Sequence, residues 1–188
     1  IDKRVASAAE AVSDIFDGAT IMFGGFGEAG SPIELIHALI DQGATNLTMI
    51  SNNCGSGEVG LAALLKAGRV SKVVCSFPRT ANSTVFPELY RSGRTKLELV
   101  PQGTLAERIR AGGAGIPAFY TPSAVGTPLA EGKESREFGG RKYVLEHGIR
   151  ADFSLIKGRV ADTHGNITME REALTLDNLA MAMAAHNS

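Results

Sequence analysis

Short apolar runs alternate along the chain with longer stretches in which apolar positions recur every three to four residues. The short runs predict buried strands, and the recurring positions predict amphipathic helices. Strands are predicted over residues 20–23, 46–51, 70–76, 96–100, 142–146 and 152–157. Because this alternation is typical of β-α units, we predict an α/β fold: a largely parallel sheet with helices on both faces, in a single domain over residues 1–188.

Two segments carry signals for the start of a helix. In the first, Ser31 precedes a proline and a glutamate follows three residues after the serine, so we expect Ser31 to cap a helix that begins at Pro32. Thr104 and Glu107 repeat this spacing. We therefore expect a second helix to begin there and residues 101–103 to form a loop.

Two further segments lack or lose the strand-helix pattern. Residues 112–141 are rich in Gly, Pro, Ser and Thr without clear periodicity, which predicts one long loop. Residues 180–185 predict a helix that runs to the end of the chain. We therefore expect the natural subunit to continue beyond residue 188.

Composition and charge narrow the classes of protein to consider. The chain has 19 Lys+Arg against 20 Asp+Glu and no basic run, which argues against a general nucleic-acid binder. Cys54 and Cys75 have no short spacing, so we expect neither a metal site nor a disulfide framework, and we favour a reducing compartment. No apolar run approaches the roughly 20 residues of a membrane span. We predict a cytoplasmic protein that does not bind membranes.

Glycine is enriched at the ends of the apolar runs, most visibly in the G-x-G-x-x-G spacing of residues 25–30. A dinucleotide site needs an acidic residue about 20 positions later, where this chain has Ser51, Asn52 and Asn53. A nicotinamide-dependent oxidoreductase is therefore disfavoured. A tight turn without a ligand remains open, and so does an anion site for a phosphate or carboxylate at the following helix.

Three predicted loops follow strands and should meet at one edge of a parallel sheet, the edge where ligands bind. They are residues 24–32, 51–57 and 101–103. The amides of Asn52 and Gln102 would suit an oxyanion site because they donate hydrogen bonds without losing a proton. Turn formation is the alternative for Asn52 and Asn53, but Gln is not a preferred turn residue.

The predicted loops offer no evident activated nucleophile. None of the four histidines lies in them and no G-x-S-x-G motif occurs, which disfavours a hydrolase. Glu28, the carboxylate within the glycine-rich segment, is either a nucleophile or an acid favoured by the positive end of a helix. The predicted loops therefore supply an anion site and amide donors, but no activated nucleophile.

Five segments, in order, resemble the A-type chain of family I coenzyme A transferases. They are residues 17–32, with Gly24-Gly25-Phe26-x-x-x-Gly30-x-Pro32, and residues 51–53, 100–110, 113–121 and 136–138. The resemblance implies an α/β subunit that pairs with a B subunit in a heterodimer or heterotetramer. It also implies ping-pong transfer of CoA from succinyl-CoA to a 3-oxo acid, in which the nucleophile is a glutamate of the B subunit. CoA would then be a thioester substrate and not a permanently bound cofactor.

The resemblance also assigns residues. The segment matched to CoA binding consists of Gly24, Gly25, Phe26, Gly27, Glu28, Ala29 and Gly30. Asn52 and Gln102 match the amides near the reacting carbonyl. The chain departs from the family pattern at Glu28-Ala29 and at residues 174–178, and the second departure could alter the acceptor pocket or the subunit contact.

The acceptor is predicted from residues 74–79 and the short link over 132–136, which resemble family members that act on 3-oxoadipate. Acetoacetate is the alternative acceptor, and a non-catalytic ligand-binding protein of the same fold is the alternative from another class. Because 3-oxoadipate has a distal carboxylate, we expect a cation or a helix N-terminus to meet it. Arg79 is the candidate.

Overall fold

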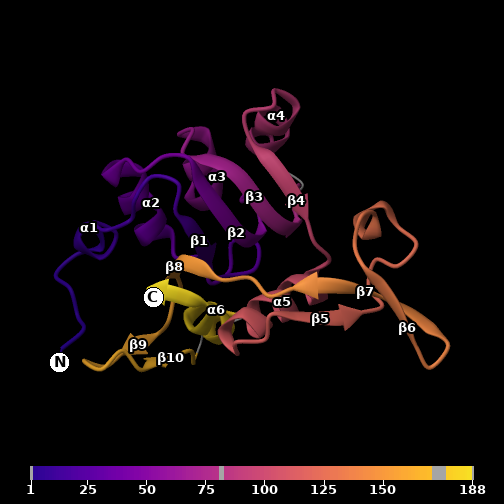
Figure 1. The fold of residues 1–188 in the computed structure, drawn as a ribbon. Coiled ribbons are helices and arrows are strands. Elements are labelled where there is room, and N and C mark those ends of the chain that lie inside the picture. Colours follow the sequence, from indigo (N-terminus) through magenta and orange to yellow (C-terminus); the bar gives the residue numbers. More distant parts are fainter. Residues whose placement is uncertain (1, 81–82, 171–176, 188) are drawn as a thin grey trace.

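The computed structural model describes residues 2–80, 83–170 and 177–187, and within these ranges six parallel strands form the main sheet. The strands are β1 (Thr20–Phe23), β2 (Leu47–Asn53), β3 (Val70–Phe77), β4 (Lys96–Leu99), β8 (Ala151–Leu155) and β11 (Ala185–Asn187). Their order across the sheet is β11-β8-β1-β2-β3-β4 (Figure 1). The parallel sheet of the prediction is confirmed.

The helices of the described residues cover both faces of this sheet. They are α1 (Ala8–Ala11), α2 (Ile33–Gln42), α3 (Gly60–Lys66), α4 (Val85–Arg91), α5 (Gln102–Gly113) and α6 (Asn178–Ala184). Successive side chains of a strand point to opposite faces: Ile21 belongs to the apolar cluster with α2, α3 and α4, and its neighbour Met22 to the cluster with α5 and α6. The two-layered covering follows from strands that are apolar at consecutive positions.

The order of the strands creates a switch point beside β1. From β1 the chain adds β2, β3 and β4 in one direction, and β8 then pairs with the opposite side of β1. In open α/β sheets, ligands bind at such a point, outside the carboxyl ends of the strands. The glycine-rich residues 24–30 leave β1 at this point.

The prediction of one long loop over residues 112–141 is wrong. This region holds β5 (Ala118–Thr121), a 3-10 turn (Pro128–Ala130) and β6 (Ser135–Phe138), and β7 (Arg141–His147) follows. The three strands form an antiparallel sheet of order β5-β7-β6, which we call the arm (Figure 1). The predicted strand 142–146 therefore exists but lies in the arm. The sequence suggests a loop because β6 is exposed at all four residues and gives no apolar signal.

Both predicted helix starts need correction. The cap residue of α2 is Pro32, which follows Ser31, and no side chain of the described residues caps this helix. Helix α5 already begins at Gln102, because the Leu105 N–H donates to the Pro101 carbonyl at 2.8 Å and closes the first turn. Gln102 is therefore a helical residue and not part of a loop.

The predicted C-terminal helix is confirmed as α6, but the chain does not stay helical to its end. β11 follows α6 directly and pairs with β8. A short hairpin of β9 (Val160–Ala161) and β10 (Ile167–Thr168) precedes α6. Among the described residues, no helix is both long enough and apolar enough to span a bilayer.

Candidate functional site

Two side-chain amides meet at the carboxyl edge of the main sheet. The Nδ2 of Asn52, at the end of β2, donates to the Oε1 of Gln102, the first residue of α5, at 2.8 Å. Ser76, near the end of β3, hydrogen-bonds to both through its hydroxyl. The structure thus brings together the two predicted amides, and it adds Ser76, which sequence reasoning missed because it closes an apolar run without a motif of its own.

The asparagines also fasten the glycine-rich segment. Asn52 Oδ1 accepts from the Gly27 N–H at 3.4 Å, and Asn53 Nδ2 donates to the Gly27 carbonyl at 3.2 Å. Asn53 Oδ1 accepts from the Gly55 N–H at 2.6 Å, an Asx-type contact. The turn interpretation therefore fits the side chain of Asn53, the last residue of β2, whereas the side chain of Asn52 serves the amide pair.

The side-chain amides of Asn52 and Gln102 differ in which of their atoms are already hydrogen-bonded. Asn52 directs its Nδ2 to Gln102 and Ser76 within the protein, and it is 7% exposed. Gln102 accepts with its Oε1, and within the described residues its Nε2 has no partner. Gln102 also stands at the positive end of α5, which favours developing negative charge. Nε2 of Gln102 is therefore a hydrogen-bond donor that the described residues leave unused.

The glycine-rich segment is a tight turn that depends on the absence of side chains. Gly25 has φ +101°, and a Cβ there would lie 2.8 Å from the Ser31 nitrogen. Phe26 N–H donates to the Ala29 carbonyl at 2.9 Å, and the Phe26 ring is 41% exposed. The segment presents backbone and one exposed ring at the switch point.

The carboxylate of Glu28 is hydrogen-bonded to the loop after β2. Its Oε1 accepts from the Ser56 hydroxyl at 2.7 Å and from the Ser56 N–H at 3.1 Å. Helix α2 starts only at Ile33, so Glu28 is not an acid of the first helical turn. It links two loops of the site.

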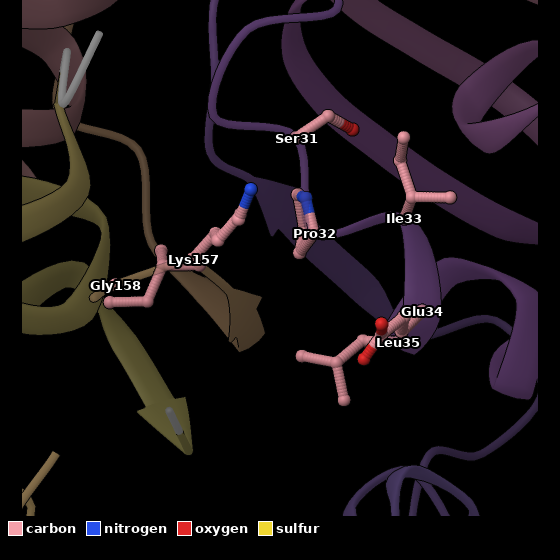
Figure 2. Close-up of a pocket in the computed structure, with 8 residues that line it drawn as sticks. Ser31, Pro32, Ile33, Glu34, Leu35, Lys157 and Gly158 are labelled. Atoms are coloured by element: carbon pink, nitrogen blue, oxygen red, sulfur yellow. The ribbon is translucent and has the colours of Figure 1, made fainter. Parts of the chain in front are cut away.

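A cavity of about 580 Å³ lies at the switch point beside these loops (Figure 2). Its lining consists of Ser31, Pro32, Ile33, Glu34 and Leu35 before and in α2, and of Ile156, Lys157 and Gly158 after β8. Figure 2 shows the amine of Lys157 directed towards Pro32. Lys157 is not among the predicted site residues, although it is the first charged residue after the apolar run of β8.

The two cysteines are buried thiols that are close in sequence to Asn52 and to Ser76. Cys54 directly follows Asn53, and its Sγ lies 3.9 Å from the Sγ of Cys75 in β3. The hydrogen bond with Cys75 and burial raise the pKa of the Cys54 thiol. A protonated buried thiol is a poor nucleophile. Cys54 is therefore a poor candidate for the activated nucleophile that the predicted loops lack.

Arg79 is exposed and follows β3. Its neighbour Thr80 donates from Oγ1 to the Gly55 carbonyl at 3.5 Å, which puts this segment beside the loop after β2. Arg79 has no ion pair within the described residues.

The departure at residues 174–178 falls partly outside the described residues, which resume at Asp177. Asn178 is 2% exposed, its Nδ2 donates to the Lys157 carbonyl at 3.4 Å, and its Oδ1 has no partner in the part of the chain that the structure describes. A Cβ on Gly24 would lie 2.4 Å from this Oδ1. The start of the glycine-rich segment therefore packs directly on α6, and burial raises the pKa of Asp177 at the start of that helix.

The chain is similar to known transferases of coenzyme A. The family model described as Coenzyme A transferase matches residues 5–187. The A-type chain of the 3-oxoadipate CoA-transferase of Pseudomonas putida is 60% identical over 185 residues, which are 98% of this chain and 80% of that protein. The A-type chain of the probable succinyl-CoA:3-ketoacid coenzyme A transferase of Bacillus subtilis is 48% identical over 182 residues, which are 97% of this chain and 75% of that protein.

A solved structure shares the fold. The acyl-CoA transferase YdiF of Escherichia coli O157:H7 superposes with a TM-score of 0.85 at 28% identity. The match covers 97% of this chain but 39% of the longer YdiF chain. The family model matches nearly the whole length of this chain. The chain therefore belongs to the coenzyme A transferase family, as the glycine-rich segment and its neighbouring amides had indicated.

Proposed function

We propose that this chain is the A-type component of an enzyme that moves CoA from succinyl-CoA to 3-oxoadipate. The observation that carries the acceptor is the difference in identity: 60% to a 3-oxoadipate CoA-transferase but 48% to a probable 3-ketoacid CoA-transferase. The amide pair supports the chemistry because acyl transfer needs donors at a carbonyl oxygen.

Gln102 is the proposed catalytic donor, and Asn52 is its positioning partner. Gln102 Nε2 hydrogen-bonds to the carbonyl oxygen as negative charge develops there, aided by the N-terminal end of α5. Asn52 holds Gln102 through the 2.8 Å bond and leaves it no freedom to turn its oxygen towards the substrate. One oxyanion donor is typically worth about 3 kcal/mol in the transition state.

The nucleophile is proposed to be a glutamate that comes from a B-type partner. This carboxylate attacks the succinyl-CoA carbonyl, and the thiolate of CoA leaves to give a mixed anhydride. The thiolate then attacks the enzyme's carbonyl of the anhydride and releases succinate, which leaves an enzyme thioester. The acceptor carboxylate then attacks the enzyme thioester and displaces the CoA thiolate, which gives a second mixed anhydride. The thiolate attacks the acceptor carbonyl of this anhydride, so that acyl-CoA is released and the glutamate is free again. Within the described site, Glu28 is bonded to Ser56 and Cys54 is a buried thiol, so neither replaces that glutamate.

The CoA thioester is proposed to lie along residues 24–30, at the edge of the cavity beside α2. The tight turn at Gly25 lets the backbone approach a ligand closely. We place Arg79 near the distal carboxylate of the acceptor, at the loop after β2. A cytoplasmic location completes the proposal, because CoA esters are soluble substrates and both cysteines are thiols.

The test is to co-purify this chain with its B-type partner and to compare kcat/KM for 3-oxoadipate and acetoacetate, with succinyl-CoA as donor. We expect a preference for 3-oxoadipate and no turnover by the isolated chain. A preference for acetoacetate would overturn the acceptor, and turnover by the isolated chain would overturn the division of labour between subunits. A complex that binds succinyl-CoA without turnover would indicate the non-catalytic alternative.

A further inference from the structure

One face of the arm carries a continuous set of aromatic and arginine side chains. Arg136 pairs with Tyr143, and Phe138 pairs with Arg141, between β6 and β7. Tyr120 on β5 pairs with Leu145, two residues beyond Tyr143. Since alternate residues of a strand share a face, the five residues Tyr120, Arg136, Phe138, Arg141 and Tyr143 lie on the same side of the arm. We call this the aromatic face.

The rings and guanidinium groups of the aromatic face contact one another. The ring of Phe138 meets those of Tyr120 and Tyr143 edge to face, with centroids 5.2 and 5.5 Å apart. The guanidinium of Arg136 lies 5.2 Å from the Tyr120 centroid, and that of Arg141 lies 5.9 Å from the Tyr143 centroid. These contacts hold the side chains in place before any partner arrives.

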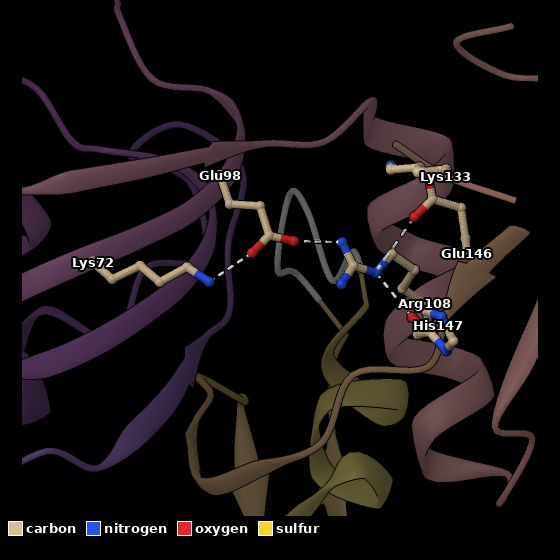
Figure 3. A network of polar contacts seen from close by, with 6 residues as sticks. All are labelled: Lys72, Glu98, Arg108, Lys133, Glu146 and His147. Carbon is tan, nitrogen blue, oxygen red and sulfur yellow. Dashed lines mark hydrogen bonds and ion pairs between the residues drawn. The ribbon is translucent and has the colours of Figure 1, made fainter. Parts of the chain in front are cut away.

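The opposite face of the arm is fixed to the body of the protein. Glu146 on that face is 3% exposed, pairs with Lys133 at 2.5 Å and lies 3.9 Å from Arg108 of α5 (Figure 3). Arg108 also pairs with Glu98 of β4 at 2.8 Å. Because this side is anchored to α5 and β4, the aromatic face is directed away from the body.

The composition of the aromatic face is that of an interface core. Aromatic residues and arginine are enriched in the cores of protein–protein interfaces and contribute most of the binding energy. On the aromatic face, Phe138 is 45% exposed. Arg136 has a carboxylate partner, Glu134 at 3.3 Å, but Arg141 has none among the described residues. An incoming carboxylate would therefore find a preoriented guanidinium beside three rings.

The occupant follows from the lengths of the related chains. In the YdiF transferase the part equivalent to this chain is 39% of the whole, so the remainder of YdiF is covalently attached to it. The A-type chain of Pseudomonas putida is matched over 80% of its length, so most of that remainder has no counterpart in it and would be a separate polypeptide. We propose that the aromatic face is the docking surface for the B-type partner, which presents apolar side chains around at least one carboxylate that pairs with Arg141. This inference rests on the proposed function, which requires such a partner.

The test measures the dissociation constant of the complex with the B-type partner by titration calorimetry. We expect Arg141→Glu and Phe138→Ser each to raise it at least tenfold. Arg141→Lys keeps the charge but loses the planar fork, and should give a smaller increase. Lys142→Glu is the matched control, because it makes the same charge change one residue further on, on the opposite face of β7. It should stay within about twofold.

Thermal unfolding of each isolated variant separates lost docking from lost folding. Wild-type affinity in both Arg141→Glu and Phe138→Ser would overturn the proposed surface. So would a wild-type chain that self-associates in light scattering and loses this with Phe138→Ser, because the occupant would then be a second copy. A failure of the proposed function looks different: the wild-type complex forms and the variants weaken it, but it does not transfer CoA to 3-oxoadipate.

Discussion

The Asn52 amide donates to the Gln102 side-chain oxygen at 2.8 Å, across 50 positions of sequence. This bond joins the end of β2 to the first turn of α5. It also decides which atom of Gln102 faces outwards, because the oxygen is engaged and the nitrogen is left as donor. Any chemistry at this edge of the sheet therefore meets a hydrogen-bond donor.

Gln102→Ala in the assembled complex should lower kcat about 100- to 1000-fold, because an oxyanion donor acts mainly in the transition state. The KM for succinyl-CoA should change little. Steady-state kinetics of the co-purified complex would measure both. A loss confined to thermal stability, with kcat within a few-fold of wild type, would show that Gln102 shapes the helix start instead.

Asn52→Ala should lower kcat less than Gln102→Ala, since Asn52 acts through Gln102. The double variant should be about as slow as Gln102→Ala alone, because residues that act as a unit are not additive. A double-mutant cycle on kcat measures this coupling. Additive losses would mean that Asn52 touches the substrate independently.

Gly24→Ala should destabilise the protein by about 1–3 kcal/mol, the usual cost of forcing atoms into a packed site. Its Cβ would meet Asn178 Oδ1 at 2.4 Å. Adding Asn178→Ala should recover part of the loss, because the obstructing atom is a side chain. Gly25→Ala is the control: its Cβ would meet backbone atoms, so Asn178→Ala should not help. Urea unfolding compares the four variants.

The ion pairs of Glu98 should make stability depend on acid pH. Burial raises the pKa of this carboxyl, but hydrogen bonds and charges from Lys72 and Arg108 outweigh it, so the pKa lies below its ordinary value of 4.5. A depressed carboxyl pKa gives stability that is present above about pH 4.5 and is lost as pH falls further. Glu98→Gln should therefore be less stable than wild type at pH 7, by up to about 1 kcal/mol for such partly exposed pairs. The two proteins should converge as pH falls below about 4.5, and a gap that persists there would contradict this origin.

Arg79→Ala should lower the ratio of kcat/KM for 3-oxoadipate over acetoacetate, because the longer acid would leave its distal carboxylate unpaired. Arg91→Ala, on the exposed end of α4, removes the same charge elsewhere and serves as control. An unchanged ratio in Arg79→Ala would show that Arg79 does not bind the distal carboxylate. The assignment to the coenzyme A transferase family would still hold.

The main sheet was predictable because its strands are apolar at consecutive positions, as in Ile21, Met22 and Phe23. From parallel strands alone, the meeting of Asn52 with Gln102 could be expected. The start of α5 could not, because the Thr104 spacing imitates a cap while Pro101 provides the real one. Thr104 Oγ1 is instead buried without a partner among the described residues.

The arm was hidden for a different reason. Only β7 gives a strand signal, whereas β5 and β6 are four residues long and every residue of β6 is exposed. What orients their side chains is a register between strands, supported by Glu146 and Arg108, which come from distant positions. Local periodicity carries no information about either.

The position of β8 beside β1 has a consequence for the order of folding. Ile21 pairs with Phe153, so one hydrogen-bonding edge of β1 stays open until the ribosome has made the chain beyond residue 155. Strands β1 to β4 can associate first, through shorter connections. Closing the other edge requires a contact of long sequence separation, which slows folding and leaves a strand edge open to aggregation meanwhile. Variants that weaken β8 should therefore reduce the yield of folded protein during synthesis before they affect the purified enzyme.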